Sequence, residues 1–151
     1  MRMRKTASVI AALLMALTLF AGCGASYQDG VYHAEFKDYD SHGWKEYVDV
    51  QVQDNKVTVL TFDGVNADGD KKSEDEDYRA SMEPVKGTYP AKFYADITNQ
   101  YLEKGELKDV TTVAGATLST DNFKALMLAL ESNMKDGVTD PVIVDSSASQ
   151  K

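Results

Sequence analysis

Hydroxyl-bearing and small residues are concentrated in residues 109–120, whose sequence is DVTTVAGATLST. Gly115 and Ala116 predict a tight turn at which a bulky group can approach the backbone. If a helix begins just after this turn, its first N–H groups and positive dipole end suit a phosphate, and Thr117 places an oxygen beside it. An ordinary turn, with Ser119 or Thr120 as the helix N-cap, fits the same residues. The spacing alone leaves both interpretations open.

The segment 113–120, VAGATLST, resembles the flavinylation motif of the FMN-binding domain family. That family includes the flavin-bearing subunits of the sodium-pumping NADH:quinone reductase and of the Rnf complex. The resemblance extends over residues 29–136 and includes the opening DGVY at 29–32 and the segment SHGW at 41–44. Small lipoproteins of Gram-positive bacteria belong to the same family.

The resemblance implies that FMN is joined to Thr117 through a phosphodiester bond formed by a flavin transferase. Gly115 and Ala116 would then be the close-approach turn, while Ser119, Thr120 and the helix start would hold the phosphate. Trp44 and His42 would lie near the flavin ring.

Two positions depart from the fuller family motif. An acidic residue is expected six positions before the threonine and often Ser or Thr three before it, where this chain has Thr111 and Ala114. Asp109 lies two positions too early to replace the acidic residue. Covalent FMN, non-covalent FMN and an empty site therefore all remain open.

The loop that contains His42 and Trp44 offers a second candidate. Trp44 could stack on a flavin ring, or it could cap the core beside the following strand. A transition-metal site is not expected, because His33 and His42 are the only histidines. Residues 66–70, NADGD, resemble part of a calcium-binding EF-hand loop, but Gly64 and Asp75 stand where its first ligand and its glutamate belong. We therefore expect residues 63–77 to be an exposed, solvated loop and residues 66–77 within it to be dispensable.

Apolar residues that alternate along the chain predict three strands, at 31–36, Lys45–Gln53 and 56–62. Asp54 and Asn55 suit a tight hairpin turn between the last two. Because residues 56–62 carry Val57 and Val59 on one face and Leu60 and Phe62 on the other, we expect an interior strand covered on both sides.

Two helices are expected after the strands. One follows Pro90. The other spans 121–135 and ends at a Gly137 C-cap; its apolar stripe is formed by Phe123, Leu126, Met127, Leu130 and Met134. Residues 141–144 suit a final edge strand in a polar tail, 138–151. The sequence predicts a single α+β domain, an antiparallel β-meander packed with two or more helices over residues 30–137.

The N-terminus has the layout of a secretory signal. Arg2, Arg4 and Lys5 precede an uncharged run that ends in small residues before Cys23, the one cysteine of the chain. This order resembles the lipobox of bacterial lipoproteins, with Phe20 where Leu is preferred. It predicts that residues 1–22 are removed, that Cys23 carries lipid and that 23–29 form a tether.

Composition excludes nucleic acid as a partner. The predicted signal holds three of the 16 basic residues and none of the 24 acidic ones, so the remaining chain has a net charge of −11. Such a charge repels phosphate backbones and anionic lipid headgroups.

These expectations describe an exported, membrane-tethered flavoprotein. It would carry electrons between a donor and an acceptor outside the cytoplasmic membrane and would not be a free-standing enzyme. Two alternatives stay open: a cofactor-free acidic lipoprotein that acts as a binding module or surface antigen, and a small extracellular reductase with loosely bound FMN.

Overall fold

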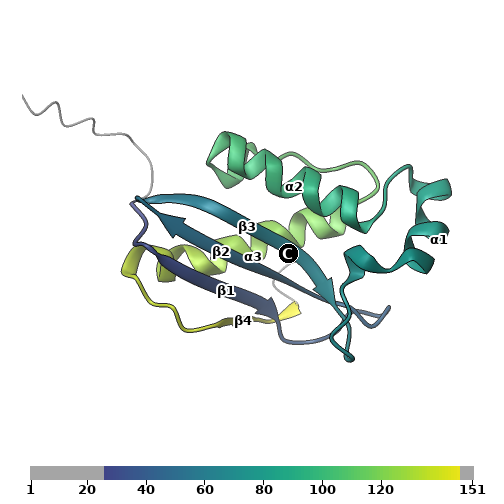
Figure 1. Ribbon diagram of the computed structural model, residues 1–151, viewed down its shortest axis with the longest axis horizontal. Helices are drawn as coiled ribbons and strands as arrows, with labels where there is room; N and C mark the ends of the chain where they lie inside the picture. The colour runs from purple at the N-terminus through teal and green to yellow at the C-terminus, as the bar shows by residue number, and fades with distance from the viewer. Residues whose placement is uncertain (1–25, 147–151) are drawn as a thin grey trace, which may run out of the picture.

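The computed structural model describes residues 26–146. The predicted signal, Cys23 and residues 147–151 lie outside this range. The strands are β1 (Gly30–Phe36), β2 (Lys45–Gln53), β3 (Lys56–Val65) and β4 (Val142–Val144), and the helices are α1 (Glu76–Lys86), α2 (Pro90–Lys104) and α3 (Thr117–Asp136) (Figure 1). Two short 3-10 turns, η1 (Lys72–Glu74) and η2 (Leu107–Asp109), complete the order. No helix within 26–146 has the length and apolarity needed to cross a membrane.

The four strands form one sheet in the order β3-β2-β1-β4. β1, β2 and β3 make the expected antiparallel meander, and Asp54 and Asn55 form its second turn with φ of 51° and 65°. The edge strand expected at 141–144 is confirmed as β4, which runs parallel to β1. The sheet is therefore mixed, and the α+β class is confirmed.

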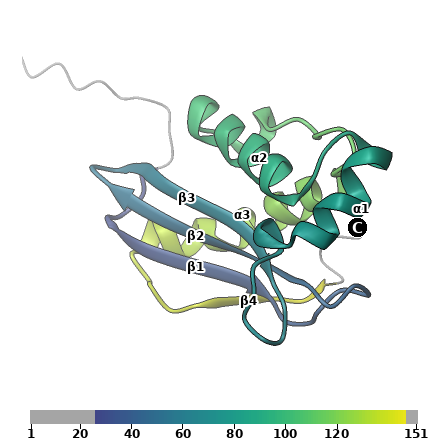
Figure 2. The same ribbon diagram turned by 45° about the vertical axis from the view of Figure 1, so that its right-hand side comes forward.

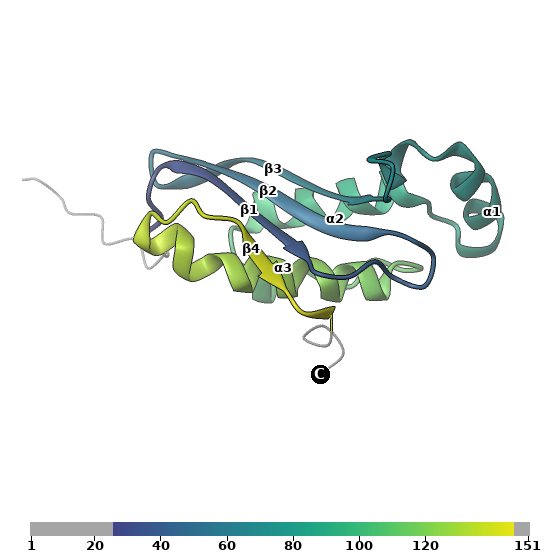
Figure 3. The ribbon, with the colours of Figure 1, turned by 90° about the horizontal axis from the view of Figure 1, so that it is seen from below.

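Helices α2 and α3 cover one face of the sheet (Figure 3). Val48, Val50 and Val52 of β2 point toward them and are almost fully buried. The predicted stripe of α3 is buried as well, with each of its five side chains at most 1% exposed. Burial of each such side chain contributes about 1.5–3 kcal/mol, so packing of α3 on the sheet is a large part of what stabilises the core.

β3 is an edge strand, and the prediction that it lies in the interior is wrong. A bulge opposite Gln51 and Val52 shifts the register, so that Val52 pairs with Val57 whereas Val50 pairs with Leu60. The shift places Val57, Leu60 and Phe62 on the helix-covered face. Val59 points outward and is 52% exposed. The strict alternation assumed for residues 56–62 fails because β3 has one extra residue between Val57 and Val59. After this residue, each side chain points to the opposite face of the sheet from the one that alternation predicts.

The acidic segment is more ordered than predicted. Asp63 is buried and accepts hydrogen bonds from the Ser73 amide (3.1 Å) and hydroxyl (2.5 Å). Lys72 is buried too, with Nζ 4.7 Å from the Tyr78 ring centroid. Helix α1 follows at the end of the sheet where β3 finishes (Figure 2). The expectation that residues 63–77 are exposed throughout is therefore corrected at Asp63 and Lys72, while residues 67–71 are exposed as expected. That residues 66–77 can be shortened without loss of stability stays a prediction.

Candidate functional site

Gly115 makes the turn that precedes α3. Its φ is +80°, in the left-handed region that glycine adopts without strain. A Cβ atom at this position would lie 3.0 Å from the Lys86 carbonyl oxygen and 3.0 Å from Thr88 Cγ2. The turn thus packs directly on the segment that joins α1 to α2, and glycine is required there for both conformation and space.

Helix α3 begins at Thr117, four residues before the predicted start at Asp121. Its N-cap is Ala116, which supplies no side-chain hydrogen bond. The prediction that Ser119 or Thr120 caps the helix is therefore corrected, since both lie inside the first turn.

Thr117 is exposed at the first position of the helix, and Leu118 beside it is 58% exposed. The first bond of the helix runs from the Thr120 amide to the Ala116 carbonyl at 2.9 Å. The amides of Thr117, Leu118 and Ser119 precede that bond and have no acceptor within the helix. An exposed hydroxyl therefore stands beside N–H groups at the positive end of a 20-residue helix.

Thr120 holds the turn together from inside. Its side chain is fully buried; the hydroxyl donates to the Ala116 carbonyl at 2.9 Å and accepts from the Val113 amide at 3.2 Å. Because both groups belong to the turn itself, Thr120 fixes the conformation around Thr117 and does not offer its side chain to a ligand.

Glu46 fastens the first turn of α3 to the sheet. Its Oε1 accepts from the Tyr94 hydroxyl (2.8 Å) and the Ser119 hydroxyl (2.7 Å), and its Oε2 accepts from Asn122 Nδ2 (2.7 Å). Glu46 is 6% exposed. Burial first, and then the neighbouring Glu46, raise the pKa of Tyr94 well above its usual value, so this phenol stays a proton donor.

The sequence interpretation missed Glu46, although its position carried a signal. In the alternating strand β2 it shares the inward face with Val48, Val50 and Val52. A carboxylate on the core face of a strand requires dedicated hydrogen-bond donors. Here those donors come from α2 and α3.

A cavity of about 350 Å³ lies beside this turn. Its lining includes Tyr39 and Trp44 from the loop before β2 and Glu46 from β2 itself. Leu118 and Asn122 of α3 also line it. Two segments that the sequence singled out separately, the Trp44 loop and the start of α3, thus share one cavity. Ligand sites typically occupy about 300–1,000 Å³, so the volume suits part of a small molecule.

Trp44 and His42 have different surroundings. Trp44 is 7% exposed and meets Tyr78 edge-on at 6.3 Å between ring centroids, so it is a wall of the cavity and not a free ring. His42 is exposed; its amide donates to Asp40 at 2.8 Å, and it is not among the residues that line the cavity. The structure therefore brings Trp44, but not His42, to the start of α3.

Acidic side chains outnumber basic ones at this cavity. Asp38, Asp40 and Glu46 all line it. The buried Lys72 places its Nζ 4.0 Å from Asp40 Oδ2. Within residues 26–146, no group of three or more His, Cys, Asp or Glu side chains is arranged to hold a metal ion. The acidic lining of the cavity suits a neutral or hydrogen-donating group better than a free anion.

Thr111, which replaces the acidic residue of the family motif, is bound to α2. Its amide and hydroxyl both donate to Gln100 Oε1, at 2.9 and 2.8 Å, and Gln100 Nε2 donates back to its carbonyl at 3.2 Å. This contact fixes the approach to the turn without a carboxylate.

No family model matches the chain. The 15 kDa lipoprotein of Treponema pallidum (strain Nichols) is 33% identical over 132 residues, which cover 87% of this chain and 94% of that protein. The CPE2226 protein of Clostridium perfringens has a solved structure that is 32% identical, with a TM-score of 0.75 over 79% of this chain and 98% of that one. On this similarity, the chain belongs to the family of the 15 kDa lipoprotein.

Proposed function

We propose that this protein is a lipid-anchored flavoprotein on the extracytoplasmic side of the membrane, with FMN bound through its phosphate to Thr117 Oγ1. The observation that carries the proposal is the setting of Thr117. An exposed hydroxyl follows the left-handed Gly115 and opens an uncapped helix, within a segment that resembles a flavinylation motif. The next residue of the helix, Leu118, lines a cavity of about 350 Å³, although Thr117 itself does not.

The residues around Thr117 fit such a group. The unbonded amides of the first turn of α3 suit a phosphate diester. Leu118 and Trp44 provide apolar surface at the cavity. Glu46 supplies only acceptor oxygens and favours a neutral ring with N–H donors over an anion. Ser119 would act through its bond to Glu46, which fixes the helix start relative to the sheet.

FMN would supply the redox chemistry, and the protein would hold it and set its surroundings. The protein would act as an electron carrier between a donor and an acceptor and not as a free-standing enzyme. A flavin transferase would be its partner in maturation.

Membrane attachment is the part with support from a relative, because the 33% identical protein is itself a lipoprotein. In this chain, Cys23 would carry the lipid after removal of residues 1–22. More than one acyl chain on this residue would make the anchor stable, since each buried methylene contributes about 0.8 kcal/mol.

The test is co-expression of the full chain with a flavin transferase, followed by peptide mass spectrometry. Trypsin releases residues 109–124 as one peptide that contains Thr117. We expect FMN on this peptide in the wild type, none in Thr117→Ala, and some in Thr117→Ser, which keeps a hydroxyl. Thr112→Ala is the matched control, since this nearby exposed threonine lies outside the turn. An unmodified wild-type peptide from folded protein would refute covalent attachment.

A cofactor-free binding module is the second candidate, favoured by the missing acidic residue at position 111. If the wild type stays unmodified, Thr111→Asp tests whether the transferase requires that carboxylate. Modification of Thr111→Asp alone would show that the turn is competent and that the wild-type motif is not. A colourless protein in both cases would favour the cofactor-free module.

A further inference from the structure

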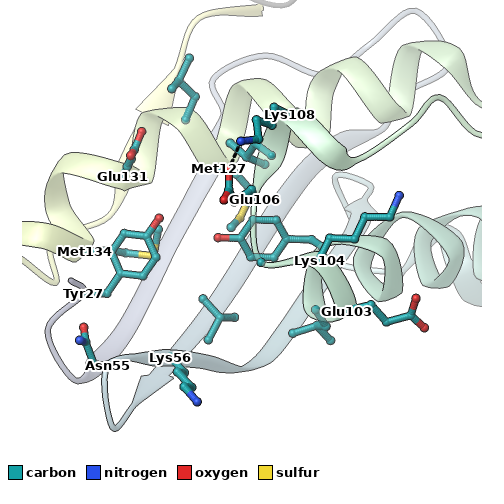
Figure 4. A pocket seen from close by; sticks show the side chains of 16 residues that line it. Tyr27, Asn55, Lys56, Glu103, Lys104, Glu106, Lys108, Met127, Glu131 and Met134 are labelled. Atoms are coloured by element: carbon teal, nitrogen blue, oxygen red, sulfur yellow. Dashed lines mark ion pairs between the residues drawn. The ribbon is translucent and has the colours of Figure 1, made fainter. Parts of the chain in front are cut away.

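A second and larger cavity lies at the opposite end of α3 from Thr117. It is an open groove of about 790 Å³ between the end of α2, the loop at 105–108, the C-terminal half of α3 and the β2–β3 turn (Figure 4). Tyr27, almost the first described residue, forms part of its wall. We call this cavity the Tyr27 groove; nothing in the proposed electron transfer uses it.

The floor of the Tyr27 groove is apolar. Tyr101, Met127 and Met134 line it and are at most 3% exposed. Leu102 and Leu128 also line it, yet they are 42% and 64% exposed. Methionine side chains adapt to irregular apolar ligands, and exposed leucines beside them gain by being covered.

Charged side chains surround this floor without a net charge. Lys56, Lys104 and Lys108 are matched by Glu103, Glu106 and Glu131. Figure 4 shows these groups around the margin, with Lys108 and Glu106 paired at 2.7 Å. The three lysines and three glutamates leave this margin neutral, whereas the chain after residue 22 has a net charge of −11. An uncharged chain is therefore the chemistry that fits it.

The polypeptide enters the described structure at this groove. The Gln28 amide donates to the Met134 carbonyl at 2.7 Å, which fixes the entry point beside the floor. Tyr27 also packs against the buried core that contains Tyr101 and Met134. Cys23 lies four residues before Tyr27 and therefore within about 14 Å of it even when the chain is fully extended.

We propose that the Tyr27 groove binds an acyl chain of the lipid on Cys23. The proposal rests on lipidation of Cys23 and is independent of FMN. Seating one acyl chain would cover Leu102 and Leu128 and hold the domain against its own anchor, while the remaining chains stay in the bilayer.

Methyl-labelled methionine provides the test, because residues 23–151 contain only Met82, Met127 and Met134. The full lipidated protein is placed in nanodiscs of perdeuterated phosphatidylcholine, so that the Cys23 lipid holds the only protonated acyl chains. We expect cross-relaxation (NOE) between acyl methylenes and the methyls of Met127 and Met134, and none to Met82 on α1. Cys23→Ser with the same discs should lose these signals.

Three outcomes would contradict the proposal, and each would identify a different fault in it. Signals that arise only with protonated bilayer lipid would make the occupant a bilayer lipid and overturn the proposal. The absence of any signal in protein whose intact mass includes the lipid would also overturn it. An intact mass without lipid would remove the occupant altogether and refute the anchor as well.

Free laurate added to Cys23→Ser tests the groove without the tether. We expect saturable shifts of Met127 and Met134, and binding about tenfold or more weaker after an added Leu128→Glu, which would bury a carboxylate under the chain. Val85→Glu, at an exposed apolar position on α1, is the control and should not change binding. Equal laurate affinity in Leu128→Glu would place the chain elsewhere and contradict the proposal.

Discussion

Removal of the Glu46 carboxylate should be the most costly single change near the start of α3. In Glu46→Ala three donors lose their acceptor at once: the Tyr94 hydroxyl, the Ser119 hydroxyl and Asn122 Nδ2. Tyr94 is 3% exposed, and an unsatisfied donor at such a site costs about 1–3 kcal/mol. Ser119 and Asn122 are half-buried and lose about 0.5–1 kcal/mol each, because water can reach them.

The expected total is about 2–4 kcal/mol of the free energy of unfolding, since loss of a buried carboxylate returns part of its desolvation cost. Glu46→Gln should cost less than about 1 kcal/mol. Its Oε1 still accepts from Tyr94 and Ser119. Its new amide can donate to Asn122 Oδ1, a buried atom without a partner in the described structure, after Asn122 turns over.

Urea unfolding, followed by circular dichroism, measures both variants. Asp49→Ala is the matched control: Asp49 lies on the outward face of the same strand, half-exposed and bonded to His33 at 2.7 Å, and its loss should cost under about 1 kcal/mol. If Glu46→Ala lowered the free energy of unfolding by less than about 1 kcal/mol, the hydrogen bonds of Glu46 would not be what holds α3 to the sheet. Equal losses in Glu46→Ala and Glu46→Gln would show that the carboxylate itself is required.

Two further predictions concern stability. Gly115→Ala should lower the urea midpoint more than Gly69→Ala: both glycines have positive φ, which costs about 1–2 kcal/mol for alanine, but only at Gly115 would the Cβ meet other atoms at 3.0 Å. Stability should also fall above about pH 10, because burial raises the pKa of Tyr94 and, to about 12, that of Tyr47, so the folded state retains protons that the unfolded chain releases. Urea midpoints from pH 8 to 11 check this; Tyr94→Phe should flatten the slope, and an unchanged slope would contradict it.

Local patterns predicted the elements that have one clear apolar face. The alternation of β2 and the stripe of α3 were sufficient to place both correctly, and the turn at Asp54 and Asn55 followed from residues that tolerate positive φ. Helix α1 was missed because it buries none of its residues and contains Pro84, so no periodic apolar signal exists. Which β3 side chains point toward the helices depends on a bulge, and residue types do not reveal a bulge.

The sequence singled out Thr117 and Trp44, but it revealed neither Glu46 nor the hydrogen bonds that connect these segments. The segment 113–120 identified Thr117, and the structure places this threonine at an exposed helix start. Sequence separation hid the remaining partners, since Glu46 and Asn122 are 76 residues apart. The buried role of Thr120 also required three dimensions, because its bonds to Val113 and Ala116 depend on how the turn closes.

Helix α3 fixes how far the two ends of the domain stand from each other. From Met134, where the chain arrives from Cys23, to Thr117 is 17 residues of continuous helix, or about 26 Å. A group attached to Thr117 is thus carried at the far end of the domain from the anchor. While the Tyr27 end faces the bilayer, a redox partner confined to the headgroup layer cannot touch that group. Under the proposed function, electron exchange would then require either a partner that projects a comparable distance from the membrane or a tether long enough for the whole domain to turn over.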